Sequence, residues 1–308
     1  MPGSPFTPLR RRLALAGGRP ADLPAEAAQG RRDQAGFRPS RLLDGHLAHH
    51  PLGAPVPWQE SVAFLDGTQH VELLGYVGTL PVVAAVVRAA VRQRESRRTH
   101  LAVQSVRRIV ISRAEAFAAL GDALAGHELL VLDGDEAPHP IRDMERAHAV
   151  VDRTRGALEL SVACAFRAIA ADTWLLVDGT LTVSPEWSSD PRMLGIVKSH
   201  AVLPFEGEAL EQYLTLPVAH RTSLFQPGSR EIAPVYAWGL RLHPFAGRDL
   251  FHGLVRIEAA ATEATREAVD TLSRHLLAER APLAADPRAD RLLYGIHDVE
   301  RFLRAQGG

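Results

Sequence analysis

The sequence predicts an α/β protein built around a mixed β-sheet that is flanked by helices. Two similar apolar runs end in Asp-Gly-Thr, VAFLDGT at 62–68 and WLLVDGT at 174–180, and such runs are typical of buried central strands. Between them lies a long segment with helical periodicity, MERAHAVVDRTRGALELSVACAFRAIA at 144–170. Strands and long helices in one chain, without a repeat of fixed period, favour a single α/β domain.

The composition is that of a globular protein. The 308 residues are 46% hydrophobic and 23% charged, which is enough for a large core. The net charge of −1 excludes binding of nucleic acid through net charge alone, so a local basic face would be needed. The single cysteine, Cys164, excludes an internal disulfide and a cysteine-based zinc site, and it fits a reducing cytoplasm. The best membrane candidate, about fifteen residues between Glu72 and Arg88, is too short to span a bilayer, so no membrane partner is expected.

The first 57 residues differ in composition from the rest. They are rich in Pro, Gly and Arg, which predicts a flexible or loosely docked N-terminal arm at 1–57 with at most a helix near 38–49. The globular pattern begins at Trp58, so the folded domain is expected to cover 58–308.

Within that domain the first strand, at 62–67, is expected to pair with 70–80 as a hairpin. Residues 81–94 fit a helix that starts at Pro81, although their valine content also allows a strand. The remaining expected elements are strands at 104–112 and 128–134, helices at 112–126, 144–170, 208–216 and 262–280, and strands at 174–182, 194–202, 233–244 and 251–260. Ser112 and Glu115 have the spacing of a capping box for the helix at 112–126.

The Asp-Gly pairs have two interpretations. Asp-Gly is a strong turn signal, because glycine adopts positive φ and aspartate caps its own turn; the copies at 41–49 and 129–137 fit a turn. Asp66 and Asp178, however, follow near-continuous apolar strands. A carboxylate at the edge of a dry core needs a partner, a proton or a metal. Two such strands side by side would supply the converging oxygen ligands that hard divalent cations require.

Two further residues are candidates for the same site. Glu159 lies on an otherwise apolar helical surface, where it is either a third acid or an edge residue with a buried stem. Lys198 is the single lysine in the chain. A GC-rich genome would explain the many arginines but not the one remaining lysine. Lys198 is either a surface residue at a strand end or a compact positive charge beside a phosphate.

Six segments, in this order, resemble the NurA nuclease family, whose fold is RNase H-like: FLDGT, ALELSVA, WLLVDGTL, GIVKSH, LVRIEAA and DPRADRLLYGIHDVERFLR. The resemblance covers roughly residues 58–304 and implies an RNase H-like mixed sheet flanked by helices, with helical insertions. The family also uses a tyrosine and a histidine near its C-terminus. Tyr294 and His297 match them, although Gly295 replaces the family's proline and the spacing is shorter.

The resemblance implies that Asp66, Glu159 and Asp178 bind a catalytic metal and that Lys198 steadies the scissile phosphate. It implies a Mn²⁺- or Mg²⁺-dependent DNA nuclease with single-strand endonuclease and 5′→3′ exonuclease activity. It also implies a homodimer that docks on a HerA-type hexameric ATPase, in DNA-end resection or in defence against phage.

A basic segment is a candidate for DNA binding. Residues 88–108 carry one acid, Glu95, and seven arginines: Arg88, Arg92, Arg94, Arg97, Arg98, Arg107 and Arg108. They would follow the DNA backbone, or they would form a solvated loop in an arginine-rich chain.

Two other functions compete with the nuclease. An actin-like ATPase or phosphotransferase also places Asp-Gly-Thr loops at strand ends, but it needs phosphate loops richer in glycine than FLDGTQH. A non-catalytic adaptor that docks on a translocase ring would keep the fold without needing the acids. The chain contains no G-x-x-x-x-G-K-[ST] motif, so it does not supply its own P-loop ATPase.

Overall fold

The computed structural model of the chain describes residues 36–306 apart from 97, 121–123, 125–126, 134–135, 229–233 and 284–288. The chain divides into two compact units, each made of two segments. Unit 1 comprises Met1–Glu60 and Leu176–Tyr294, and unit 2 comprises Ser61–Leu175 and Gly295–Gly308.

Unit 2 is built on three long antiparallel strands, β4 (Val62–Val77), β5 (Leu80–Glu95) and β6 (Arg98–Ser112). The short β7 (Glu128–Val131) adds to β6 in parallel, after the helix α2 (Ala114–Leu120). Valine and alanine fill β5, and its residues from Ala89 to Val91 are fully buried. The hairpin therefore forms a stiff platform.

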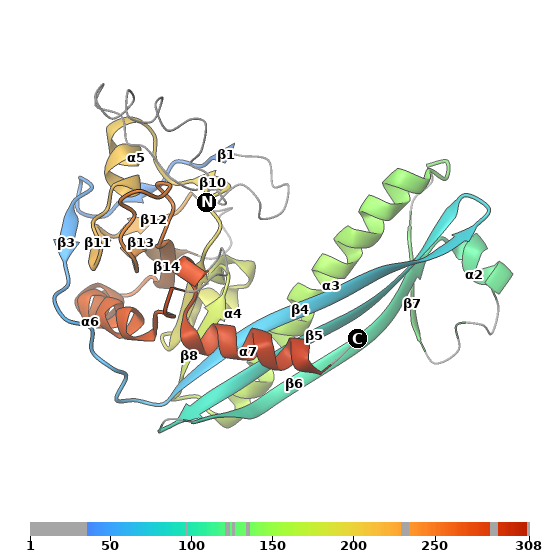
Figure 1. Ribbon diagram of the computed structural model, residues 1–308, viewed down its shortest axis with the longest axis horizontal. Helices are drawn as coiled ribbons and strands as arrows, with labels where there is room; N and C mark the ends of the chain where they lie inside the picture. Colours follow the sequence, from blue (N-terminus) through green and yellow to red (C-terminus); the bar gives the residue numbers. More distant parts are fainter. Residues whose placement is uncertain are drawn as a thin grey trace, which may run out of the picture. The chain divides into compact units, whose positions relative to one another are not determined.

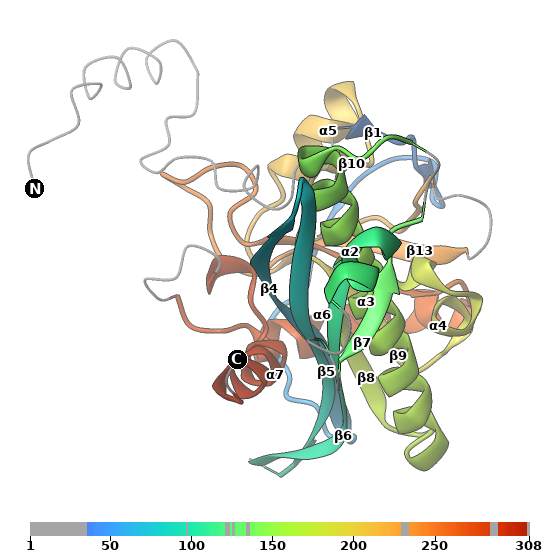
Figure 2. The ribbon, with the colours of Figure 1, turned by 90° about the vertical axis from the view of Figure 1, so that its right-hand side faces the viewer.

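The helix α3 (Pro140–Ile169) packs along β4, β5 and β6 (Figures 1 and 2). It begins at a proline, where the missing N–H costs nothing, and its buried residues recur at helical spacing from Ala147 to Phe166. Its first turn is fixed to the end of β6, because Asp143 accepts two hydrogen bonds from Arg113, at 2.7 and 2.8 Å. This bidentate ion pair sets the position of the whole helix against the strands.

The C-terminal helix α7 (Tyr294–Ala305) lies on the opposite face of the same strands (Figures 1 and 2). A side chain at Gly295 would come within 2.3 Å of the Phe64 ring, so glycine is needed for the close approach. Further along, Asp298 pairs with Arg92 at 3.1 Å and accepts a hydrogen bond from Thr99. The two faces of β4 thus belong to two different helices.

Unit 1 contains a second set of strands in the order β2, β12, β13, β14, β9. They are β2 (Arg41–Leu42), β12 (Phe225–Gln226), β13 (Val235–Arg241), β14 (Leu254–Ala260) and β9 (Met193–Val197). Strand β11 (His220–Thr222) joins β13 to β3 (His49–Pro51), and β1 (Gly36–Phe37) pairs in parallel with β10 (Val202–Leu203). The helices are α4 (Pro185–Ser189), α5 (Gly207–Leu214) and α6 (Glu263–Glu279), with 3₁₀ turns at Leu181–Val183 and Ala289–Arg291.

Strand β8 (Trp174–Asp178) carries the chain from unit 2 into unit 1. At its start, Trp174 donates its backbone N–H to the carbonyl of Ser61 at 3.0 Å. In the described residues, no helix is both long enough and apolar enough to cross a membrane.

The structure corrects three expectations. The helix near 38–49 is wrong: residues 36–51 form β1, β2 and β3, which pair with strands of unit 1, and residues 1–35 of the predicted arm lie outside the described residues. The hairpin of 62–67 with 70–80 is wrong, because both segments belong to the single strand β4, which pairs with β5. For residues 81–94, where the sequence allowed a helix or a strand, the structure has strand β5. Ser112 does not cap α2, because it ends β6 and its buried hydroxyl donates to the carbonyl of Pro81 at 2.7 Å.

Candidate functional site

Asp66 is buried in the first half of β4, and not at the strand end that the sequence predicted, because β4 continues through the Asp-Gly-Thr motif to Val77. Its Oδ1 accepts a hydrogen bond from the backbone N–H of Gly67 at 2.7 Å. Residues two apart in a strand share a face, so Asp66 points to the side of Phe64, which α7 covers.

Glu159 lies against the same glycine. A Cβ placed on Gly67 would be 2.2 Å from Glu159 Oε1 and 2.9 Å from its Cδ, so the carboxylate occupies the space of the missing side chain. One turn earlier on α3, Arg155 pairs with Glu159 at 3.2 Å. The Glu159 side chain is mostly buried, so its carboxylate is held between the helix and the strand rather than extended into solvent.

Both carboxylates of unit 2 therefore reach Gly67, one at its N–H and the other at its side-chain position. They approach from opposite sides of β4, because successive strand residues point to opposite faces. The backbone of β4 at Gly67 therefore lies between the two carboxylates. The Asp-Gly pair here is part of a strand rather than a turn.

In unit 1, Asp178 and Lys198 form an ion pair with 3.0 Å between Oδ2 and Nζ. Asp178 ends β8, and Lys198 directly follows β9. Their side chains are 29% and 19% exposed, so both charges can still reach a ligand. The lone lysine thus contacts one of the predicted acids.

Two glycines let β9 approach the turn that follows Asp178. Gly179 has φ of +138° and donates its N–H to the carbonyl of Ile196 at 3.0 Å. A side chain on Gly195 would come within 2.7 Å of the Gly179 carbonyl oxygen. The motif GIVKSH therefore needs its glycine to bring Lys198 to Asp178.

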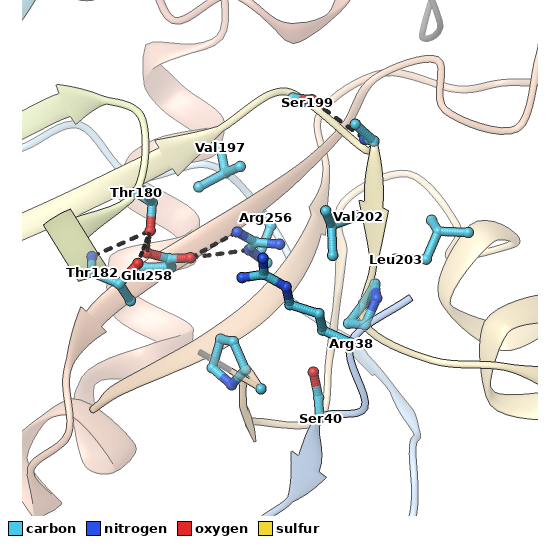
Figure 3. A pocket seen from close by; sticks show the side chains of 14 residues that line it. Arg38, Ser40, Thr180, Thr182, Val197, Ser199, Val202, Leu203, Arg256 and Glu258 are labelled. Atoms are coloured by element: carbon cyan, nitrogen blue, oxygen red, sulfur yellow. Dashed lines mark hydrogen bonds and ion pairs between the residues drawn. The ribbon is translucent and has the colours of Figure 1, made fainter. Parts of the chain in front are cut away.

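Glu258 is a functional-site neighbour that the sequence interpretation did not single out. It is only 1% exposed on β14, opposite Gly195. Its Oε2 accepts from the Thr180 hydroxyl at 2.6 Å and from the Leu181 N–H at 2.9 Å, and its Oε1 pairs with Arg256 at 2.9 Å (Figure 3). Glu258 therefore holds the loop that follows Asp178. The signal was an acid inside the apolar strand LVRIEAA.

We expect Glu258→Ala to lower the free energy of unfolding by about 3 kcal/mol, because the change leaves a largely buried guanidinium and two hydrogen-bond donors without their acceptor. Urea denaturation followed by circular dichroism measures the change. Glu263→Ala, which removes an exposed acid at the start of α6, is the control and should cost less than about 1 kcal/mol. Equal midpoints for the two variants would contradict the role given to Glu258.

His200 anchors the segment just beyond Lys198. It is buried, its Nε2 lies 2.9 Å from the Leu254 carbonyl oxygen, and its ring packs on Phe251 with 5.0 Å between ring centroids. Burial lowers the pKa of His200 to about 3, although the bond to the carbonyl opposes the shift. The imidazole is therefore neutral in the folded chain at neutral pH.

We expect this histidine to make stability depend on pH. Between pH 7 and pH 5 the unfolded chain gains a proton on His200 that the folded chain does not accept, so the free energy of unfolding falls by about 2 kcal/mol as the pH is lowered. The contribution of His200 to the free energy of unfolding is constant above about pH 6.5, the pKa of histidine in the unfolded chain. Urea melts of wild type and His200→Gln at both pH values isolate this contribution. An identical pH slope in the two proteins would refute it.

The two C-terminal candidates differ in exposure. Tyr294 is 60% exposed at the first residue of α7. His297 is one turn further along the helix, with its Nδ1 3.7 Å from Glu300 Oε2. Because α7 covers the face of β4 that Asp66 shares, His297 is carried on the same side of the strands as Asp66. Roles for both residues stay predictions.

The basic segment 88–108 is strand rather than loop. Arg88 is buried, Arg92 binds Asp298 and lies over the Phe302 ring, and Arg107 forms an ion pair with Glu128. Arg94 lies over the Phe64 ring at 5.7 Å. Two members, Arg98 and Arg108, are exposed, whereas Arg97 lies outside the described residues. Most of these arginines thus have roles inside unit 2.

No group of three or more His, Cys, Asp or Glu side chains among the described residues is arranged to hold a metal ion. Asp66 and Glu159 belong to unit 2 and Asp178 to unit 1. Convergence of the three acids therefore stays a prediction, whereas the structure does bring Glu159 to the residue after Asp66 and Lys198 to Asp178.

No family model matches the sequence, and no curated protein sequence matches it either. The fold is similar to a solved structure, the NurA nuclease from Sulfolobus solfataricus, with a TM-score of 0.53 and 10% identity. The match covers 97% of this chain and 89% of that one. At this identity the likeness shows the fold alone, and it confirms the NurA-like mixed α/β architecture that the motifs predicted.

Proposed function

We propose that the chain is a divalent-metal-dependent nuclease that cleaves DNA. The observation that carries the proposal is the position of Glu159, whose carboxylate fills the side-chain space of Gly67 directly after Asp66. A glutamate that served only as an edge residue would extend to solvent, and it would not need a glycine to receive it. The likeness of the fold to a nuclease gives the second support.

The donor set fits a hard cation. Asp66, Glu159 and Asp178 offer carboxylate oxygens, which Mn²⁺ and Mg²⁺ prefer over softer ligands. Because Asp66 and Glu159 lie on opposite faces of β4 at Gly67, each would contribute its oxygens to a cation from its own side of the strand. When bound, such an ion lowers the pKa of a water and neutralises charge on a phosphate.

The chain's own residues hold and orient the reacting groups. Lys198 neutralises Asp178 in the free protein, and its ammonium can turn to a non-bridging phosphate oxygen when a strand binds. Glu258 keeps the loop after Asp178 in one conformation, which reduces the cost of ordering it on binding. His297, on the Asp66 side of β4, is a second donor for the phosphate or the leaving oxygen.

The finer proposals follow the resemblance. We propose single-strand endonuclease and 5′→3′ exonuclease activity, a homodimer, and docking on a HerA-type hexameric ATPase in end resection or phage defence.

The test is digestion of end-labelled single-stranded DNA by the full chain, with Mn²⁺ and with EDTA. Cleavage that requires the metal is the expected result. Hydrolysis of ATP by the isolated chain without DNA cleavage would favour the actin-like phosphotransferase instead. Binding to a translocase ring with neither activity would favour the adaptor.

A further inference from the structure

Unit 1 contains a cavity of about 300 Å³ next to the loop that follows Asp178, and a few charged and hydroxyl side chains stand among its mostly apolar lining (Figure 3). Its lining includes Thr180, which is two residues after Asp178, and Val197 and Ser199, the two neighbours of Lys198. Arg38 and Arg256 supply its positive charges, and Ser40 and Thr182 add hydroxyls. The volume is at the lower end of the range for small-ligand pockets.

Arg38 is fixed at the cavity by its backbone. The N–H of Arg38 donates to the carbonyl of Leu203 at 3.1 Å, and the N–H of Ser40 donates to the carbonyl of Pro204 at 3.1 Å. Gly228 lies against the same segment: a Cβ on Gly228 would be 2.3 Å from the carbonyl oxygen of Pro39, so only glycine allows this close approach. The backbone of Arg38 is thus held beside the cavity, whereas its side chain is exposed.

The two guanidinium groups point toward one another across the cavity (Figure 3). Arg256 is partly neutralised by Glu258, which takes its Nε and one Nη donor and leaves others unused. Within the part of the chain that the structure describes, the Arg38 guanidinium has no carboxylate partner. The lining residues therefore carry an excess positive charge, and two like charges face each other.

Like charges held face to face are stabilised by an anion between them, and planar guanidinium groups match the oxygens of a phosphate. Hydroxyls at Ser40 and Ser199 can donate to further oxygens. We infer that this cavity binds a phosphate group of the nucleic-acid strand, with Arg38 as its main cation. The inference rests on the proposed nuclease function, because it places a strand phosphate beside the loop of Asp178.

The test measures binding separately from cleavage. Anisotropy of a short single strand labelled at its 3′ end is followed in EDTA, with a 5′-phosphate or a 5′-hydroxyl, and with inorganic phosphate as competitor. Arg38→Ala should weaken binding at least about 10-fold and reduce the dependence of log affinity on log salt by about 0.7. Arg41→Ala is the matched control, because Arg41 is in the same segment, outside the cavity, and bonds to Gln226.

A loss confined to the 5′-phosphorylated strand would assign the cavity to the terminal phosphate, and an equal loss for both strands would assign it to an internal phosphodiester. If Arg38→Ala abolished competition by inorganic phosphate but left the affinity for both strands unchanged, the assignment of the cavity to a strand would be overturned. Equal affinities of the Arg38 and Arg41 variants would overturn the inference altogether. If the two variants bound equally and Mn²⁺-dependent cleavage were normal, the cavity inference would fail and the proposed nuclease function would be supported. If binding depended on Arg38 but no cleavage occurred, only the nuclease function would be rejected.

Discussion

Asp66→Asn and Asp178→Asn should each reduce metal-dependent DNA cleavage by more than about 100-fold, while both proteins stay folded. The amide keeps the size of the side chain but removes the charge that binds a divalent cation. Loss of a group that only supports a metal ligand already costs about 10- to 100-fold, so loss of a ligand itself should cost more. Initial rates on labelled single-stranded DNA, across a range of Mn²⁺ concentrations, measure the effect.

Asp44→Asn is the matched control for these variants. Asp44 also precedes a glycine, but Gly45 has φ of +83°, and Asp44 pairs with Arg266 at the surface. This Asp-Gly is a turn, so its variant should cleave at the wild-type rate. Wild-type rates for both Asp66→Asn and Asp178→Asn would show that any cleavage comes from another site or a contaminant.

Gly67→Ala should reduce cleavage by about 100-fold without reducing stability. The new methyl group would lie 2.2 Å from Glu159 Oε1, so the carboxylate has to move. A displacement of about 1 Å in a catalytic site can cost about 100-fold in rate. The fold should tolerate the change, because the atoms that have to move belong to the Glu159 side chain and not to the backbone, and glycine inside a strand is itself unfavourable.

Gly156→Ala gives the corresponding control on α3, three residues before Glu159. A Cβ at Gly156 meets nothing within 4 Å, so this variant should keep full activity and gain up to about 1 kcal/mol of helix stability. Thermal melts and cleavage rates of the pair separate a local effect on Glu159 from a general effect of alanine. Full activity of Gly67→Ala would remove Glu159 from the mechanism.

The sequence predicted the elements whose patterns are local. The apolar runs before Asp66 and Asp178 and the helical spacing of 144–170 correspond to β4, β8 and α3. It did not predict the short strands at 36–51, because their order comes from hydrogen bonds to residues more than 150 positions away. Nor could it choose helix or strand for 81–94, since valine and alanine on both faces erase the periodicity.

For the candidate site, pattern and residue type both contributed. The apolar runs before Asp-Gly indicated Asp66 and Asp178, the acid on an apolar helical surface indicated Glu159, and Lys198 was singled out as the one lysine. Glu258 was missed because an acid within a strand gives no sign of what it binds; its partners at Thr180 and Leu181 are about 78 residues away. The role of Arg38 was hidden for the same reason, because only the packing of 36–40 on 201–204 brings it to the cavity.

Lys198, which pairs with Asp178, can also be modified selectively by a chemical reagent. Because the sequence contains one lysine, an amine-selective acylating reagent has a single side chain to modify, and it is the one that contacts the candidate site. The extent of acylation at Lys198, read as the mass shift of the peptide that contains it, therefore reports on whether a bound strand or Asp178 shields its ammonium group.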